Sequence, residues 1–221
     1  MPPHFINMYF LGMETIFSLV IFILALLIYL RTQEIFSLTK HQGIKYFRNT
    51  FLFFSLAYAF RFLFVLFNVS MFTKGIFIPR HIIQPLFLVL TSYLSTMAII
   101  FLTLSVIWKK FKKKEINLLL HLISIMIALI ILLTRSPLIL IILQAALLIF
   151  SLIMALKTHS KSKKFSKLII IYVLLSLFWI VNLSFLGAKL FIPMELGILF
   201  NIISIGIFAY ILHKVAKLIK W

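Results

Sequence analysis

The chain of 221 residues contains no cysteine and no aspartate, and its acidic side chains are four glutamates. The absence of cysteine excludes disulfides, iron–sulfur clusters, thiolate zinc sites and cysteine nucleophiles. Intramembrane enzymes that handle phosphates need grouped carboxylates to hold a divalent cation, and no expected span contains two glutamates. A Walker-type loop and the HxxxH or HExxH spacing of metal ligands are also missing. We therefore expect no enzymatic activity, no metal and no cofactor.

Apolar residues are abundant instead. They make up 64% of the chain, against roughly 45 to 50% in soluble domains. A bilayer core about 30 Å thick needs about 20 mostly apolar residues per helix, and seven such stretches are separated by polar breaks. Their approximate limits are 8–30, 48–68, 82–108, 116–134, 137–156, 168–188 and 191–212. The sequence predicts an all-α integral membrane protein with a single domain of seven transmembrane helices.

Positive charge is distributed unevenly between the two ends of these helices. Lysine and arginine total 22, for a formal net charge of +18. Seventeen of them fall on one side of the alternating spans, four on the other, and Arg61 lies within a span. Because cytoplasmic loops carry the excess of lysine and arginine, we expect the N-terminus outside, the C-terminus inside, and a multi-pass location in the cell membrane.

The two densest basic segments are the run at 109–114 and the lysine cluster at 157–167. Both are short loops tied to the ends of spans, and base-stacking aromatic residues are not interleaved with them. We expect them to set the topology and to contact anionic lipids at the lysine-rich inner face, since juxtamembrane basic residues are attracted to an acidic leaflet. No nucleic-acid partner is expected.

An internal repeat is suggested by sliding the chain along itself. An offset of 114 aligns residues 51–79 with 165–193 without a gap, and nine of the 29 positions are identical. The polar matches include Tyr58 with Tyr172 and Asn68 with Asn182. Chance is the alternative, because the offset is the best of many. A real match predicts a parallel 3+1+3 repeat, with halves 8–108 and 137–212 and a linker helix at 116–134.

This arrangement resembles the seven-helix sugar-transporter fold of the SWEET and PQ-loop kind, and also the seven-helix receptor and opsin topology. The resemblance is one of architecture. The Pro-Gln pair of the PQ-loop proteins is replaced by Gln84-Pro85 in reverse order, and residues 191–212 contain no lysine for a retinal Schiff base. It implies either a transporter or a ligand-sensing receptor.

Ionisable residues inside the spans are the strongest candidates for a functional site, because they are costly in lipid. Glu14 and Arg61 are expected at a similar depth, roughly 9 to 10 Å below the outer edge at 1.5 Å per residue. Glu195 begins the seventh helix nearby. The remaining candidates are polar side chains expected in the same outer half: Asn182, Gln144, Tyr58, Gln84 and Tyr93.

Two accounts of these residues remain open. In the structural account, Glu14 and Arg61 form a buried ion pair and the amides bond to each other. In the functional account, Arg61 is held by Glu14 and faces a cavity, while Glu195, Asn182 and Gln144 select a small polar or zwitterionic ligand. We expect a transporter-like protein for a small polar solute. A receptor or docking subunit with a cytoplasmic protein partner, or a purely structural subunit, is the alternative.

Overall fold

The structure is a computed structural model that describes residues 8–74, 80–110, 116–134, 136–159, 166–188 and 194–219. Side chains near several helix ends lie outside the description, which covers them for 11–70, 83–109, 118–134, 136, 138–158, 169–182 and 196–217. The helices are α1 (Met8–Thr39), α2 (Gln42–Lys74), α3 (Arg80–Ile107), α4 (Ile116–Thr134), α5 (Pro137–His159), α6 (Ser166–Ala188) and α7 (Met194–Ile219). A short 3-10 turn, Trp108–Lys110, follows α3.

Five of these helices are long and apolar enough to cross a membrane: α1, α2, α3, α5 and α7. The described parts of α4 and α6 are shorter apolar segments, Leu118–Thr134 and Ile169–Asn182. Several large apolar side chains of α4 are exposed, among them Leu118, Leu122 and Met126, as a lipid-facing surface requires. The chain is therefore an all-helical, multi-pass membrane protein.

The predicted helix limits agree best with the observed ones where apolar residues reach both ends of the helix. The limits of α4 are those predicted, and α5 begins at Pro137 as expected for a first-turn proline. The first two helices are longer than predicted, because their polar ends continue as helix past the apolar stretch. Only Lys40 and His41 separate α1 from α2, so a tight turn replaces the expected loop.

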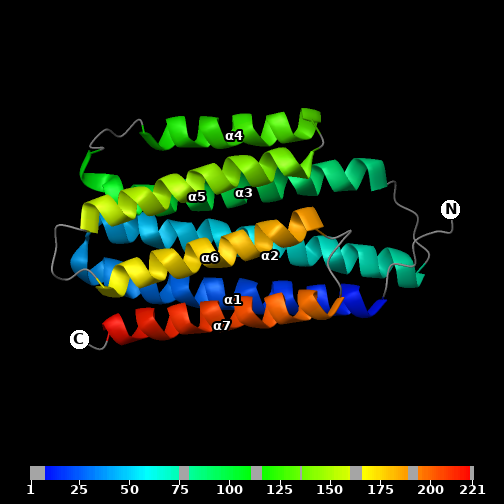
Figure 1. Cartoon of the computed structure of the whole chain (residues 1–221), viewed down its shortest axis with the longest axis horizontal. Coiled ribbons are helices and arrows are strands. Elements are labelled where there is room, and N and C mark those ends of the chain that lie inside the picture. The colour runs from blue at the N-terminus through cyan, green and yellow to red at the C-terminus, as the bar shows by residue number, and fades with distance from the viewer. Residues whose placement is uncertain are drawn as a thin grey trace.

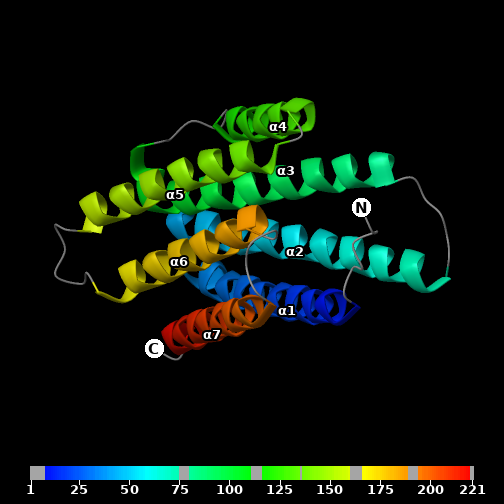
Figure 2. The same cartoon turned by 45° about the vertical axis from the view of Figure 1, so that its right-hand side comes forward.

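The helices lie roughly along one direction, and the start of α1 and the end of α7 are at opposite ends of the bundle (Figure 1). Neighbours in contact follow the order α1, α2, α3, α5, α6, α7 and back to α1. Helix α4 stands outside this ring against α3, with a smaller contact to α5 (Figure 2). We call the end that carries the α1–α2 turn and the end of α7 the basic end.

The centre of the ring is filled by aromatic side chains. Phe54 of α2, Phe178 of α6 and Phe208 of α7 are buried, with ring centroids 5.4 Å apart for Phe54–Phe178, 5.0 Å for Phe54–Phe208 and 4.6 Å for Phe178–Phe208. Phe51 packs on Phe208 at 6.3 Å. We refer to Phe51, Phe54, Phe178 and Phe208 as the aromatic barrier, because together they close the middle of the bundle with large apolar rings.

The contacts between α2 and α6 do not follow the register of the suggested repeat. Tyr58 bonds to Asn182, Phe54 packs on Phe178, and Phe47 packs on Tyr172 at 6.2 Å. Residues at equal depth are thus about 124 positions apart, whereas the repeat pairs residues 114 apart. At 1.5 Å per residue, Tyr58 and Tyr172 differ in depth by roughly 15 Å. A parallel repeat needs matched residues at equal depth, so the structure does not support that register.

Candidate functional site

The ion pair expected between the first two helices is present. Arg61 Nη2 donates to Glu14 Oε1 at 3.0 Å, and the two side chains are 19% and 10% exposed. The Arg61 guanidinium also lies over two rings, 5.7 Å from the centroid of Phe17 and 5.5 Å from that of Tyr58. A cation over an aromatic face is attracted by the ring quadrupole. Glu14 and the two rings therefore fix the position of the guanidinium.

A second polar group joins α2, α6 and α7. The Tyr58 hydroxyl donates to Asn182 Oδ1 at 2.9 Å. Asn182 Nδ2 donates to the Phe178 carbonyl at 2.9 Å and approaches Ser204 Oγ of α7 at 3.4 Å. Tyr58 and Ser204 are buried, so these bonds satisfy polar atoms that would be costly to leave unpaired in an apolar interior.

The third group joins α3, α5 and α6. The buried Gln144 side chain donates from Nε2 to Ser95 Oγ at 2.5 Å and approaches Thr96 Oγ1 at 3.4 Å. Its Oε1 accepts from Trp179 Nε1 at 3.2 Å. Trp179 lies three residues before Asn182 on α6, and both Trp179 and Tyr58 pack on Phe54 at 4.9 Å. The three groups thus form one polar layer around the centre of the ring.

The group of Tyr58, Asn182 and Ser204 lies beside the aromatic barrier, on the side away from the basic end, whereas the Gln144–Trp179 group is level with the barrier. Phe54 and Phe178 are each one helical turn closer to the basic end than Tyr58 and Asn182, their polar neighbours on α2 and α6. Phe208 follows Ser204 by one turn on α7, which runs in the opposite direction. Three helices therefore place a phenylalanine between a polar side chain and the basic end.

The position of the layer along the helix differs from one helix to another. Tyr58 is sixteen residues from each end of α2, whereas Glu14 is six residues from the start of α1 and Gln144 is seven from the start of α5. Helices α2 and α3 consequently extend further past the layer than α5 and α6 do. Figures 1 and 2 show that, at the end of the bundle opposite the basic end, α2 and α3 reach beyond α5 and α6. Glu14, Gln144 and Asn182 lie near the helix ends away from the basic end, whereas Tyr58 is at the middle of its helix.

Two of the sequence candidates are outside the layer. Gln84 is exposed and precedes Ser95 by eleven residues, roughly 16 Å along α3. The Tyr93 hydroxyl is 2.7 Å from His121 Nδ1 of α4. Tyr93 and Ser95 are two positions apart, so at about 100° per residue they point to opposite sides of α3. Gln84 and Tyr93 therefore do not contact the layer from α3.

Glu195 lies in the first turn of α7, as the sequence predicts, but its side chain is outside the described residues. By helix length, its backbone lies roughly 13 Å further from the basic end than Ser204, whereas Arg61 lies roughly 4 to 5 Å further than Tyr58. Glu195 is therefore nearer to the end of the bundle than Arg61 is.

Sequence reasoning missed several members of the layer: Ser95, Thr96, Trp179 and Ser204. Single hydroxyl residues are common in apolar helices and bond equally well to their own backbone, so the sequence gives little signal for them. Trp179 could have been predicted, because it is three residues before Asn182 and therefore lies on the same face of the helix. Among the described residues, no group of three histidine or acidic side chains that could hold a metal ion occurs.

Seven helices, a polar layer within apolar spans and an aromatic barrier define a polytopic membrane protein. No protein-family model matches the chain, and no solved structure matches it. The chain is similar to an uncharacterized protein of Archaeoglobus fulgidus, with 30% identity over 221 residues that cover 98% of this chain and 96% of that relative. The chain belongs to the same family as that protein. Because the relative is described as uncharacterized, we infer function from the geometry of the polar layer.

Proposed function

We propose that this protein is a seven-span transporter of a small polar solute, with the N-terminus outside and the basic end in the cytoplasm of the cell. The solute carries an anionic group that binds Arg61 in the polar layer. The proposal includes no chemical step. It rests above all on the position of the Arg61 guanidinium, which is held by Glu14 between two rings and remains partly exposed.

The donor capacity of Arg61 supports an anionic ligand. A guanidinium has five N–H donors in a planar fork, while one carboxylate accepts two of them in the best geometry. Glu14 contacts the fork through Nη2, so donors remain for a second anion. A solute with a high negative charge would be repelled by Glu14. A zwitterion is favoured, because its ammonium group can interact with Glu14 while its carboxylate binds Arg61.

The order of helix contacts also supports transport. The ring divides into two sets of three helices, α1–α2–α3 and α5–α6–α7. Within each set, the first helix contacts the second and the second contacts the third, and the two sets contact each other through α3 with α5 and through α1 with α7. If α1 is exchanged with α5, α2 with α6 and α3 with α7, the list of neighbouring helices in the ring stays the same. Two three-helix units joined by a peripheral α4 are the arrangement that a rocking mechanism of alternating access needs. Here the helix order supports the proposal, and the register of the sequence match does not.

The aromatic barrier supports the same interpretation. A transporter must be closed on one side of its binding site when the site opens to the other. Phe54, Phe178 and Phe208 pack together between the basic end and the polar side chains Tyr58, Asn182 and Ser204. The structure fits a state closed toward the cytoplasm, in which solute reaches Arg61 from outside.

The test is uptake and counterflow in proteoliposomes with a pooled small-metabolite extract. We compare the wild type, the double variant Glu14→Gln/Arg61→Gln, and the matched control Arg31→Gln/Glu34→Gln, which neutralises an exposed ion pair at the basic end. Saturable accumulation of one solute should be lost in the first variant and retained in the control. Equal accumulation in wild type and the Glu14/Arg61 variant would remove Arg61 from the solute site.

A receptor is the second candidate, because side-chain bonds of the layer connect α2, α3, α5, α6 and α7. A ligand that displaced any of these bonds would shift several helices together, and the change would reach a cytoplasmic partner through the basic end. The same proteoliposomes distinguish the two functions. Retention of one metabolite by the protein, without accumulation inside the vesicles, would favour the receptor.

A further inference from the structure

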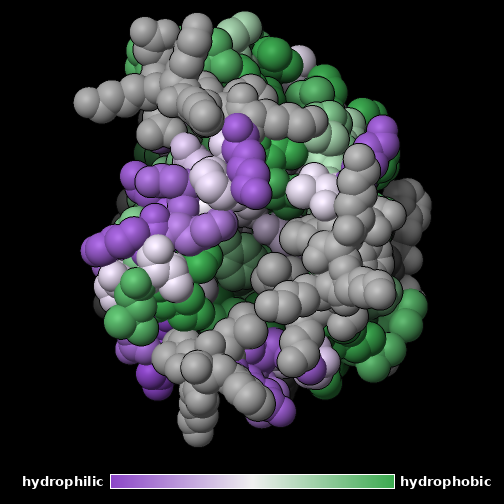
Figure 3. Space-filling view, turned by 90° about the vertical axis from the view of Figure 1, so that its left-hand side faces the viewer, coloured by the Kyte–Doolittle hydropathy of each residue, from purple (hydrophilic) through white to green (hydrophobic). Residues whose placement is uncertain are grey.

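The basic end carries a second cluster of charged and aromatic side chains, independent of the polar layer. The α1–α2 turn and the flanking helix ends supply Arg31, Lys40, Lys45 and Arg48, and Lys109 follows α3. Figure 3 shows hydrophilic side chains gathered on this end next to apolar ones. Glu34 pairs with Arg31 at 3.4 Å, so most of the positive charge of the turn is not balanced by that carboxylate.

Lys40 occupies a backbone conformation that usually belongs to glycine. Its φ is 52°, and its N–H donates to the Phe36 carbonyl at 2.8 Å, which ends α1. Glycine is preferred at this position because a side chain there is strained. The Lys40 ammonium lies 5.9 Å from the centroid of the Phe36 ring. A lysine is thus present where folding alone would favour glycine.

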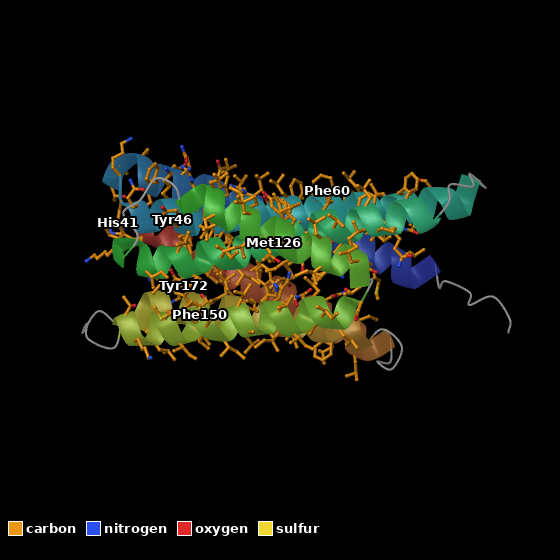
Figure 4. All side chains as sticks on the ribbon, turned by 90° about the horizontal axis from the view of Figure 1, so that it is seen from above. His41, Tyr46, Phe60, Met126, Phe150 and Tyr172 are labelled. Atoms are coloured by element: carbon orange, nitrogen blue, oxygen red, sulfur yellow. The ribbon has the colours of Figure 1, made fainter. Side chains whose placement is uncertain are left out.

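Trp108 joins this turn to the end of α3. Its ring packs edge-on against His41, with centroids 4.8 Å apart, and Lys109 Nζ lies 5.8 Å from the indole centroid. A Cβ added at Gly43 would approach the indole and the His41 ring to 3.0 Å. The glycine therefore permits the close contact that places an indole between His41 and Lys109. Figure 4 shows His41 and Tyr46 at this end of the bundle.

Arg48 is also held by aromatic rings. Its guanidinium carbon lies 5.0 Å from the Phe36 centroid and 5.6 Å from that of Tyr29, and its Nη1 donates to Gln33. Rings and cations are thus interleaved at the ends of three helices. Tryptophan, tyrosine and basic side chains at this level are typical of the headgroup region of a bilayer.

We propose that the α1–α2 turn and Trp108 form a specific binding site for the headgroup of an anionic phospholipid. Lys40 and Lys109 bind the phosphate, and Trp108 and Phe36 lie along the first carbons of the lipid. The apolar component favours a lipid over a soluble protein. The rings of Trp108 and Phe36 lie beside the lysine ammonium groups, and a phospholipid covers such rings with the first carbons of its chains while its phosphate contacts the cations.

The experiment uses the fluorescence of Trp108 in vesicles of defined composition. Phosphatidylcholine vesicles contain one lipid in ten with brominated chains, and the brominated lipid is either phosphatidylglycerol or phosphatidylcholine. The emission of a Trp108→Phe variant is subtracted, so that the signal reports Trp108 and not Trp179 or Trp221. We expect brominated phosphatidylglycerol to quench Trp108 several-fold more than brominated phosphatidylcholine does.

Two variants and a matched control test the residues. Lys40→Gly and Lys109→Gln should each weaken the preference for phosphatidylglycerol by up to roughly 5-fold, since one basic residue near an acidic surface contributes about 1 kcal/mol. Glycine fits the backbone of residue 40, so Lys40→Gly should leave the unfolding temperature unchanged or raised. Lys214→Gln/Lys217→Gln removes two charges from the end of α7 and should leave the preference intact.

Three outcomes would overturn the proposal. Equal quenching by the two brominated lipids would show no headgroup preference. An equal loss in the α7 control would show general surface charge instead of a site. A change of Trp108 emission with millimolar inorganic phosphate in detergent, without a lipid preference in vesicles, would assign the cations to free phosphate.

Discussion

The pair Glu14–Arg61 permits a quantitative prediction about stability. With its two side chains only 10% and 19% exposed and 3.0 Å between the bonded atoms, most of the pair is out of water. Removal of one partner of such a pair leaves an uncompensated charge, at a cost of about 3 to 5 kcal/mol. For a chain of this size, about 2 to 4 °C corresponds to 1 kcal/mol. Arg61→Gln or Glu14→Gln alone should lower the unfolding temperature by roughly 6 to 20 °C.

The double variant Glu14→Gln/Arg61→Gln should recover most of this loss, because two amides can bond to each other and neither charge is stranded. A deficit of about 1 to 2 kcal/mol should remain from the lost contacts of Arg61 with the Phe17 and Tyr58 rings. Thermal unfolding in one detergent measures all three variants. Arg31→Gln/Glu34→Gln is the control and should cost less than about 1 kcal/mol, since that pair is exposed. Losses that simply add in the Glu14/Arg61 double variant would refute a coupled buried pair.

Other predictions use the same protein. Tyr58→Phe removes the bond to α6 and should cost about 1 kcal/mol in thermal unfolding, whereas the exposed Tyr210→Phe should cost much less; equal losses would contradict the bond. Phe208→Ala opens a cavity in the aromatic barrier and should cost about 3 to 5 kcal/mol, and a cost below 1 kcal/mol would mean that the barrier is loosely packed. The native chain has no cysteine, so a single introduced cysteine can report the topology. Leu38→Cys should react with an impermeant maleimide only from the cytoplasm, and Gln84→Cys only from outside. The reverse pattern would show that the topology is the opposite of the proposed one.

Much of the fold follows from the sequence, because the bilayer imposes a strong constraint on length and polarity. An apolar run of 19 residues between charged breaks predicted α4 at its limits. The ends of α1 and α2 were less predictable. Hydropathy marks where a helix leaves the hydrocarbon and not where its backbone hydrogen bonds end, so the helical segments 31–39, 42–47 and 69–74 were missed.

The polar layer was predictable in part for a related reason. A charge within a span must find a partner, and Glu14 was the nearest carboxylate in depth to Arg61 on a neighbouring helix. Tyr93 shows the limit of this reasoning. Its depth was estimated from its place in the sequence, but the side of α3 on which it lies depends on where α4 packs, and a peripheral helix with apolar residues on several faces gives no clear signal of its docking side.

The register of α2 against α6 illustrates why a sequence match and a structural equivalence can differ. The match at 114 rests on Tyr58 with Tyr172 and Asn68 with Asn182. In the structure Tyr172 bonds to Ser105 of α3 at 2.6 Å, whereas Tyr58 bonds to Asn182. The two tyrosines make different bonds at different depths, so the structure gives this match no support. Both tyrosines serve the same general use, as an apolar ring with one polar atom that a buried partner can satisfy.

The buried hydrogen bonds can be sorted by whether they stay within one three-helix set or connect the two sets. Glu14–Arg61, Trp179–Gln144 and Asn182–Ser204 stay within a set. Tyr58–Asn182, Gln144–Ser95 and Tyr172–Ser105 connect the sets. Under the proposed transport mechanism, rocking strains the connecting bonds and leaves the others intact. Each connecting bond that opens in an apolar interior costs free energy unless water or solute replaces it, so a polar solute that bonds to the exposed layer would lower the barrier to its own passage.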